Sequence, residues 1–473
     1  MTESQLLALD PALIGYLEGF RPSCCSSPTF DHMAMYVRGL LSDLERKSAE
    51  PIGLASGTPP RTVQEFLRDH AWDYEVIRRV IQTEVAQKVQ SMPNDGLGVV
   101  GLVDETSVRK QGTKSPGVNR QYLGCLGKVG NGIVTVHLGV CLGRYKTLID
   151  GDLFLPEVWS ADRQRCREAG IPDEIVHRPK WQIALEQFDR SRVNGVVMDW
   201  LTFDAEYGKV PKYLAGLAAR NQQFVGEVGR TWASSGGGKD GSAPGPQATS
   251  RAAEELVRSC SLFRSQPWQV LRLSRETTNE QVWRVKAGQV WGSSAEGWSA
   301  KSYWLIWASS DQTGEEKFFV SNAPSDTPVE KLVRVAFRRA NVEHAFRVCK
   351  SELGFGHFEG RNYTGLMRHM MLCLGAMEFV ADHTDRLRGE KSGHHDGASV
   401  SGVSTFGRRM GNTQQRHDEA GVFAHGGIVP PTAKSNSNKF KEKASDRCPS
   451  PEKTQAEKAE KQGEIERPHE VAL

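Results

Sequence analysis

Two aspartates directly follow apolar runs that are typical of β-strands, a position from which a carboxylate can reach a cleft at the edge of a sheet. Asp104 ends the apolar run in GLGVVGLVDETS, and Asp204 follows the run NGVVMDWLTF. Taken singly, each residue is explained as an aspartate that caps a turn. If the two strands are neighbours, however, the carboxylates meet, and their hard oxygen ligands can hold a divalent cation.

A third acid, Glu343, lies on a predicted amphipathic helix. The buried stripe of this helix consists of apolar residues at helical spacing: Val335, Val342, Phe346, Cys349 and Leu353. At 100° per residue, Glu343 lies about 80° from the centre of the stripe, on the same flank as Arg339 and Lys350. Arg347 lies farther round, at about 120°. By itself, one acid among three bases favours a salt-bridge ladder; beside two aspartates, it could be a third metal ligand.

The elements that must position these acids predict an α/β fold. Between residues 96 and 229, three strand-like runs are followed by two helical stretches, a fourth strand, another helix and a fifth strand. This order is the skeleton of a ribonuclease H-like fold, a mixed sheet flanked by helices. In such a sheet the first and fourth strands are neighbours, which would bring Asp104 and Asp204 together.

Four further segments surround this core region. Residues 1–95 predict a helical N-terminal domain, which could bind DNA or form a plain bundle. A Gly/Ser/Pro linker and short Trp-bearing strands at 230–325 predict a β-rich insertion. Two long helices at 326–386 would complete the catalytic core. Residues 387–473 contain almost no large apolar side chains, so we expect this tail to be disordered.

Composition narrows the classes of protein to which the chain can belong. The 473 residues include 60 Lys and Arg against 57 Asp and Glu, a near balance that neither requires nor excludes nucleic acid. Residues 329–371 contain eight Lys or Arg against four Glu, a surplus suited to binding phosphates. The nine cysteines show no zinc-ligand spacing. Without an apolar run of membrane-spanning length or a signal-peptide pattern, we expect a cytoplasmic protein with no membrane partner.

Several long blocks of the chain resemble DDE transposases of bacterial insertion sequences. These blocks are VDETSVRKQGTKSPGVNRQYLGCLGKVGNGIVTVHLGV, LTFDAEYG and VEHAFRVCKSELGFGHFEGRNYTGLMRHMMLCLGAMEFV. The chain is similar to the branch described as a DDE endonuclease superfamily related to the IS-four group, over about residues 36–382. The resemblance implies that Asp104, Asp204 and Glu343 are catalytic and bind two Mg²⁺ or Mn²⁺ ions. It further implies double-stranded DNA as the partner, both terminal inverted repeats and target, and a homodimer that pairs two ends.

The family also has a tyrosine-arginine-glutamate-lysine signature around its glutamate. In this sequence the arginine and lysine fall on Arg339 and Lys350, which the resemblance assigns to binding DNA phosphates. The tyrosine falls on Ala336 and is therefore missing, although Phe337 is adjacent. Two further cations are candidates for phosphate contacts: Arg347 and Lys110.

Two other functions fit the same sequence. A degenerate or domesticated copy would keep the fold and bind element ends as a repressor without cutting them. A ribonuclease H-like repair or junction nuclease would cut DNA without requiring a terminal repeat. The tryptophans of the insertion could stack on an unpaired base, although strand spacing favours plain packing; they are Trp291, Trp298, Trp304 and Trp307.

Overall fold

Amphipathic helices form the N-terminal part of the chain, as their periodicity predicts. The computed structural model describes residues 9–389 apart from 237–241, 246, 276–277 and 296. The first helices are α2 (Leu9–Glu18), η1 (Arg21–Ser23), α3 (Ser27–Leu41), α4 (Ala49–Ala55), α5 (Pro60–Arg68) and α6 (Tyr74–Ser91). Ser26 and Asp73 begin α3 and α6 by accepting backbone N–H groups with their side chains, as capping residues do. The predicted disordered tail lies outside the described residues from residue 390 onward.

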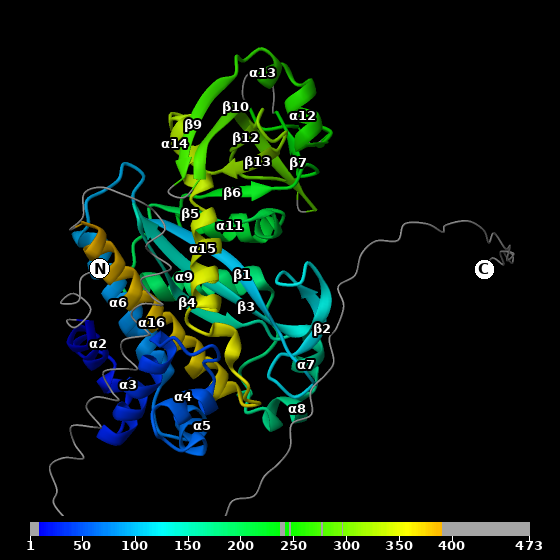
Figure 1. Cartoon of the computed structure of the whole chain (residues 1–473). Helices are drawn as coiled ribbons and strands as arrows, with labels where there is room; N and C mark the ends of the chain where they lie inside the picture. Colours follow the sequence, from blue (N-terminus) through cyan, green and yellow to red (C-terminus); the bar gives the residue numbers. More distant parts are fainter. Residues whose placement is uncertain (1–8, 237–241, 246, 276–277, 296, 390–473) are drawn as a thin grey trace, which may run out of the picture. The chain divides into compact units, whose positions relative to one another are not determined.

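A five-stranded mixed sheet follows, and helices pack against it (Figure 1). Its strands are β1 (Val100–Arg109), β2 (Asn119–Leu123), β3 (Lys128–Leu142), β4 (Tyr145–Leu153) and β5 (Trp200–Thr202). The order is β2-β3-β1-β5, and β4 also pairs with β3. Strand β1 is antiparallel to β3 and parallel to β5. The predicted mixed α/β architecture is therefore confirmed.

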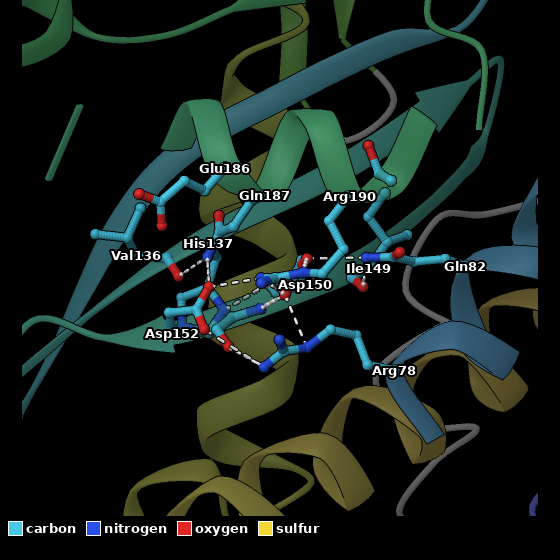
Figure 2. A network of polar contacts seen from close by, with 12 residues as sticks. Arg78, Gln82, Val136, His137, Ile149, Asp150, Asp152, Glu186, Gln187 and Arg190 are labelled. Carbon is cyan, nitrogen blue, oxygen red and sulfur yellow. Dashed lines mark hydrogen bonds and ion pairs between the residues drawn. The ribbon is translucent and has the colours of Figure 1, made fainter. Parts of the chain in front are cut away.

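Strand β4 is not predicted by the apolar pattern, because Asp150 and Asp152 interrupt it. The structure buries both carboxylates by pairing them with arginines from two helices, α6 and α9 (Lys180–Val193), as Figure 2 shows. Arg78 of α6 lies 3.2 Å from Asp150 and 3.4 Å from Asp152. Arg190 of α9 lies 2.9 Å and 2.7 Å from the same two residues. This network ties the N-terminal helices to the sheet.

Short helices connect the strands around this sheet. They are α7 (Glu157–Ala161), α8 (Arg163–Glu168), α10 (Ala205–Gly208) and α11 (Pro211–Ala219). The last part of the chain forms α14 (Val329–Phe337), α15 (Ala340–Ser351), η2 (Phe355–His357) and α16 (Tyr363–Gly389). Helix α15 packs on β1 and β4, and α16 packs on β4 and on the N-terminal helices α3, α5 and α6. In the part of the chain that the structure describes, no helix is both long and apolar enough to cross a membrane.

A second sheet of eight strands contains the predicted β-rich insertion. Its strands are β6 (Val225–Val228), β7 (Ala233–Ser235), β8 (Arg251–Ala252), β9 (Gln269–Arg275), β10 (Thr278–Ser294), β11 (Gly297–Trp298), β12 (Tyr303–Ser309) and β13 (Glu316–Ser321), with helices α12 (Ala253–Ser259) and α13 (Ser261–Arg264) between them. Strand β6, expected as the fifth strand of the core sheet, pairs along its length with β13. It also lies beside the first sheet, because Phe224, just before β6, forms a parallel bridge to Leu201 of β5 and the N–H of Glu227 donates to the carbonyl of Phe203. The two sheets are thus continuous through β6.

The helix predicted around Glu343 is not continuous. It is broken after Phe337, and the chain tightens there because the N–H groups of Arg338 and Arg339 bond to carbonyls three residues back. Such bonds belong to a tighter turn than the α-helix. The angular prediction for Glu343 assumed an unbroken helix and holds only within α15. Arg339 lies at the break, as the residue that precedes α15.

Candidate active site

The strand register brings Asp104 and Asp204 to the same level of the sheet. The last paired position of the parallel strands β1 and β5 joins Leu102 to Thr202. Each aspartate follows its paired residue by two positions, so both lie just beyond the end of β5. The sequence predicts Asp104 at the end of its strand. Strand β1 instead continues to Arg109, so Asp104 lies within it. The side chain is reachable because β5 stops before it.

Asp204 also has the capping role that its sequence context suggested. Its Oδ1 accepts the backbone N–H groups of Glu206 and Tyr207, at 3.0 Å and 3.3 Å, and so begins α10. These bonds fix the carboxylate just beyond the end of β5. Capping and cation binding are compatible here, because both capping bonds use one oxygen and leave Oδ2 available.

Arg339 lies between the acids. Its guanidinium donates to Oδ2 of Asp104 at 3.2 Å and to Oε1 of Glu343 at 2.9 Å. Its Nε lies 3.9 Å from Oε2 of Glu227 on β6. Burial alone would lower the pKa of Arg339, but these carboxylates and Asp204 more than offset it and raise the pKa. Arg339 therefore faces four acids, of which Glu227 also pairs with Lys317 at 3.5 Å.

The electrostatics of the two aspartates follow first from burial and then from the neighbouring charges. Burial, with the neighbouring charge of Asp204, raises the pKa of Asp104 to about 7, although Arg339 acts in the opposite direction. Burial also raises the pKa of Asp204, against the effects of Arg339 and the capping N–H groups. Buried carboxylates with raised pKa values are common at functional sites, because a bound cation can supply the missing charge.

Glu343 is near the pair but does not complete it. Its side chain is 61% exposed and reaches Asp104 only through the shared guanidinium of Arg339. As the side chains stand, the described stretch of the chain contains no group of three His, Cys, Asp or Glu residues that could hold a metal ion. The predicted trio is brought into one neighbourhood, with an arginine between its first and third members.

The predicted phosphate-binding cations fall into different surroundings. Lys350 lies on α15, close enough for Asp104 to influence its pKa, which burial lowers overall. Arg347 is exposed and donates to Nδ1 of His344 at 2.7 Å. The ammonium of Lys110 donates to the carbonyl of Phe358, and burial lowers its pKa to about 8. The contacts of Lys110 are those of a structural lysine, so its phosphate role stays a prediction without support from the geometry.

Two acids of this neighbourhood were missed in the sequence. Glu227 joins through β6, whose N–H at this residue bonds to the carbonyl of Phe203, next to Asp204. Glu105 follows Asp104 and pairs with Lys180 at 2.7 Å. The signal for Glu227 was a charged residue inside the apolar run QQFVGEV, a position that in a buried strand requires a partner.

The residues around the missing signature tyrosine pack into the insertion. Ala336 is buried, and the ring of Phe337 lies 4.9 Å from Trp283 and 5.8 Å from Phe319, centroid to centroid. Phe337 therefore does not take the place of the tyrosine at the acids. Of the insertion tryptophans, Trp291 and Trp307 are buried, in agreement with the packing role that strand spacing favours.

Comparisons with known proteins agree with this geometry. The family model described as "DDE superfamily endonuclease" matches residues 23–287, more than half of the chain. This range includes Asp104 and Asp204 and ends before Glu343. A protein of Microchaete diplosiphon named "Probable transposase for insertion sequence element IS701" is 35% identical over 190 residues, which are 40% of this chain and 46% of that protein. The match thus spans less than half of the relative's length.

A solved structure has a weaker likeness. It is the "Cryo-EM structure of piggyBac transposase synaptic complex with hairpin DNA", with 10% identity and a TM-score of 0.43 over 86% of this chain and 80% of that one. A score this low supports no conclusion about a shared fold. The family model, in contrast, matches more than half of the chain, including Asp104 and Asp204. The chain therefore belongs to the DDE superfamily of endonucleases.

Proposed function

We propose that this protein is a transposase that cuts and joins DNA at the ends of an insertion sequence, with Asp104, Asp204 and Glu343 as its metal-binding carboxylates. The observation that carries the proposal is the register of β1 and β5, which sets two partly buried aspartates side by side, with Arg339 as the arginine that acts on both. The sheet supports a ribonuclease H-like fold, because β1 is antiparallel to β3 and parallel to β5.

The donor set fits Mg²⁺ or Mn²⁺ in its chemistry, because these hard cations prefer carboxylate oxygens. Asp104 and Asp204 form the fixed part of the site, on a strand and at a helix start. Glu343 is the adjustable part, since its exposed side chain can turn from Arg339 towards the aspartates. Two bound ions would activate the attacking oxygen and stabilise the leaving oxygen of a phosphodiester.

The remaining residues position DNA. Without a cation, Arg339 neutralises Asp104 and Glu343 and keeps them from repelling one another. With a cation held by Asp104 and Asp204, the planar guanidinium of Arg339 would be able to bind a phosphate through two parallel hydrogen bonds. Lys350, farther along α15, adds a point charge on the same side of the site. Terminal inverted repeats and target DNA are the proposed partners, with a homodimer pairing two ends.

The test is cleavage of a supercoiled plasmid that carries the element's own ends, in Mg²⁺. Asp104→Asn, Asp204→Asn and Glu343→Gln should each reduce nicking by about 10³-fold or more, because several kcal/mol of charge stabilisation are lost. End binding, measured by gel shift, should be largely kept. Glu352→Gln and Asp173→Asn are control variants away from the cluster and should nick as the natural sequence does. Normal nicking by any one of the three site variants would remove that residue from the site.

Two observations favour an alternative, a DNA-binding repressor that does not cut. Among the described residues the three acids do not converge as they stand, and Ala336 replaces the signature tyrosine. The same assay separates the two functions, because a repressor shifts the DNA in the gel and leaves the plasmid supercoiled. A junction nuclease would instead cut plasmids that lack the terminal repeats.

A further inference from the structure

Glu343 also lines a groove whose lining includes neither Asp104 nor Asp204. It has a volume of about 640 Å³ and runs between α14, α15 and the turn at residues 95–97, which precedes β1. Its lining includes five cations and three acids: Lys146, Lys331, Arg334, Arg338 and Arg347, with Asp95, Glu330 and Glu343. The sequence signature around Glu343 accounts for none of these cations. A basic groove that opens from a candidate phosphodiester-cutting site needs an explanation of its own.

The cations of the groove are not equivalent. Arg338 is part of its wall, because it pairs with Asp95 at 2.6 Å and donates to the carbonyl of Gly143 at 3.0 Å. Arg334 pairs with Glu330 one turn away, and both side chains are about half exposed, at 44% and 54%. An exposed pair of this kind contributes little to stability and can exchange its carboxylate for a phosphate.

The other two cations of interest, Arg347 and Lys331, contact uncharged partners. Arg347 donates to a histidine nitrogen and not to a carboxylate, so this contact leaves its charge uncompensated. The ammonium of Lys331 lies 5.5 Å from the centre of the Trp200 ring, which orients it without neutralising it. Lys331, Arg334 and Arg347 are therefore the cations that a polyanion in the groove would meet.

The dimensions suit a nucleic-acid backbone. From Ala340 to Arg347, α15 rises about 10 Å at 1.5 Å per residue. Along one strand of duplex DNA, phosphates recur about every 3.4 Å of helix axis, so this length spans about three of them. Five cations against three acids give the lining a positive charge that suits a polyanion.

We infer that this groove holds the DNA strand that continues from the scissile phosphate, with its phosphates on Lys331, Arg334 and Arg347. The inference rests on the proposed function, since it takes Glu343 as the position of the cut. It adds a surface that guides one side of the cut strand, separate from the acids and from Arg339 and Lys350.

Salt dependence of DNA binding tests the inference. A triple variant, Lys331→Gln, Arg334→Gln and Arg347→Gln, is compared with a control triple variant of exposed cations elsewhere: Arg167→Gln, Arg192→Gln and Lys212→Gln. Both variants have three fewer positive charges, so their general attraction to DNA falls equally. The probe is a labelled duplex that carries the element's terminal repeat and flank, titrated without divalent metal between about 50 and 200 mM salt. Thermal unfolding of both variants confirms that they are folded.

The groove variant should show a slope of log affinity against log salt that is less steep by about 2.7, or about 0.9 for each phosphate that the variant no longer binds. The control variant should keep the slope of the natural sequence to within about 0.9. Equal slopes for the two triple variants would overturn the inference.

Neutral methylphosphonate linkages locate the phosphates that the groove binds. Placed one at a time along the probe, they should weaken binding by the natural sequence on one side of the cut, and this penalty should vanish in the groove variant. A penalty that persists in the groove variant also overturns the inference. The outcome for the proposed function is independent, because it is judged by whether the natural sequence nicks the plasmid in Mg²⁺.

Discussion

Two pairs of aspartates lie on or just beyond the strands of the first sheet, and their charges are balanced in different ways. Asp150 and Asp152 on β4 have two arginines, Arg78 and Arg190, and burial costs them little because these partners lower the pKa of Asp152. Asp104 and Asp204 share one arginine with two other acids, and the pKa of Asp104 is raised to about 7. The aspartates of β4 thus form a structural ion-pair network with two arginines. Asp104 and Asp204, in contrast, have one arginine between them.

Hydrogen bonds extend the contrast. In the β4 network, Gln82 donates to Asp150 at 2.9 Å and Gln187 donates to Asp152 at 3.0 Å, so each amide adds a hydrogen bond to a carboxylate oxygen that Arg190 also contacts (Figure 2). At the candidate active site, the two capping bonds leave Oδ2 of Asp204 available. A buried ion pair with every partner in place resists change, whereas a pair with unmet charge invites a ligand. The difference separates structure from function without any knowledge of conservation.

The largest effect on stability is expected from breaking the β4 network. Arg78→Met should lower the free energy of unfolding by about 3–5 kcal/mol, because it removes one of the two arginines that pair with the buried carboxylates of Asp150 and Asp152. Urea unfolding followed by circular dichroism measures the change. The control is Arg220→Met, which removes a half-exposed pair with Asp189 and should cost no more than about 1 kcal/mol. Equal costs for the two variants would show that the network is not a structural joint.

A smaller stabilisation is expected when Mg²⁺ is added to the natural sequence. At a concentration about 100 times its dissociation constant, one bound ion adds about 2.7 kcal/mol to the free energy of unfolding. The shift in the thermal midpoint should disappear in the Asp104→Asn, Asp204→Asn double variant and return to baseline with a chelator. The same shift in the double variant would assign the ion to another part of the chain.

A third kind of buried acid, Glu378 on α16, has no arginine at all among its strongest interactions. Burial raises its pKa to about 7, against the hydrogen bond from Tyr16. A carboxyl whose pKa is higher in the folded state stabilises the fold when protonated, so stability falls as the pH rises from about 4.5 to 7. Glu378→Gln should therefore add about 2 kcal/mol at pH 8 and almost nothing at pH 4.

The measurement for Glu378 is urea unfolding at both pH values. Glu168→Gln, which changes an exposed glutamate of α8, is the control and should leave the difference between the two pH values unchanged. A Glu378 variant with the same pH dependence as the natural sequence would contradict the prediction.

The smallest effect is expected for Asp104→Asn. Removing one of two repelling carboxylates should leave the free energy of unfolding unchanged or raise it by about 1 kcal/mol, while nicking is lost. Asp150→Asn on β4 is the matched substitution and should instead destabilise the protein, because its arginines lose a partner. If both variants lose stability equally, the contrast between the two aspartate pairs fails.

Much of the site could be predicted from local patterns. Asp104 and Asp204 stood out because an acid directly follows or interrupts an apolar strand, and strand order alone implied that they meet. Glu343 could be placed on a helix flank by its spacing from Val342 and Phe346. These are signals within one element, where the period of the backbone decides which side chains share a face.

Other features depend on contacts between distant segments and leave no local signal. Strand β4 was hidden because Asp150 and Asp152 owe their burial to arginines on α6 and α9. The break between α14 and α15 was hidden because both halves are amphipathic, and the turn at Arg338 is anchored by Asp95, far away in the sequence. The guanidinium of Arg339 between Asp104 and Glu343 likewise follows from tertiary packing.

The position of strand β6 restricts which segments of this protein can be deleted or exchanged. It bridges to β5 at Phe224, pairs along its length with β13 from the far end of the insertion, and carries Glu227 to the acids. A deletion of the whole segment between residues 230 and 325 would remove the hydrogen-bonded neighbour of β6, β13, and expose a bare strand edge beside the candidate active site. The second sheet therefore cannot be removed as an independent module. Shortening is compatible with the fold only in the loops that join its strands. An exchange of the whole sheet for another domain would also remove β6 from its place beside β5.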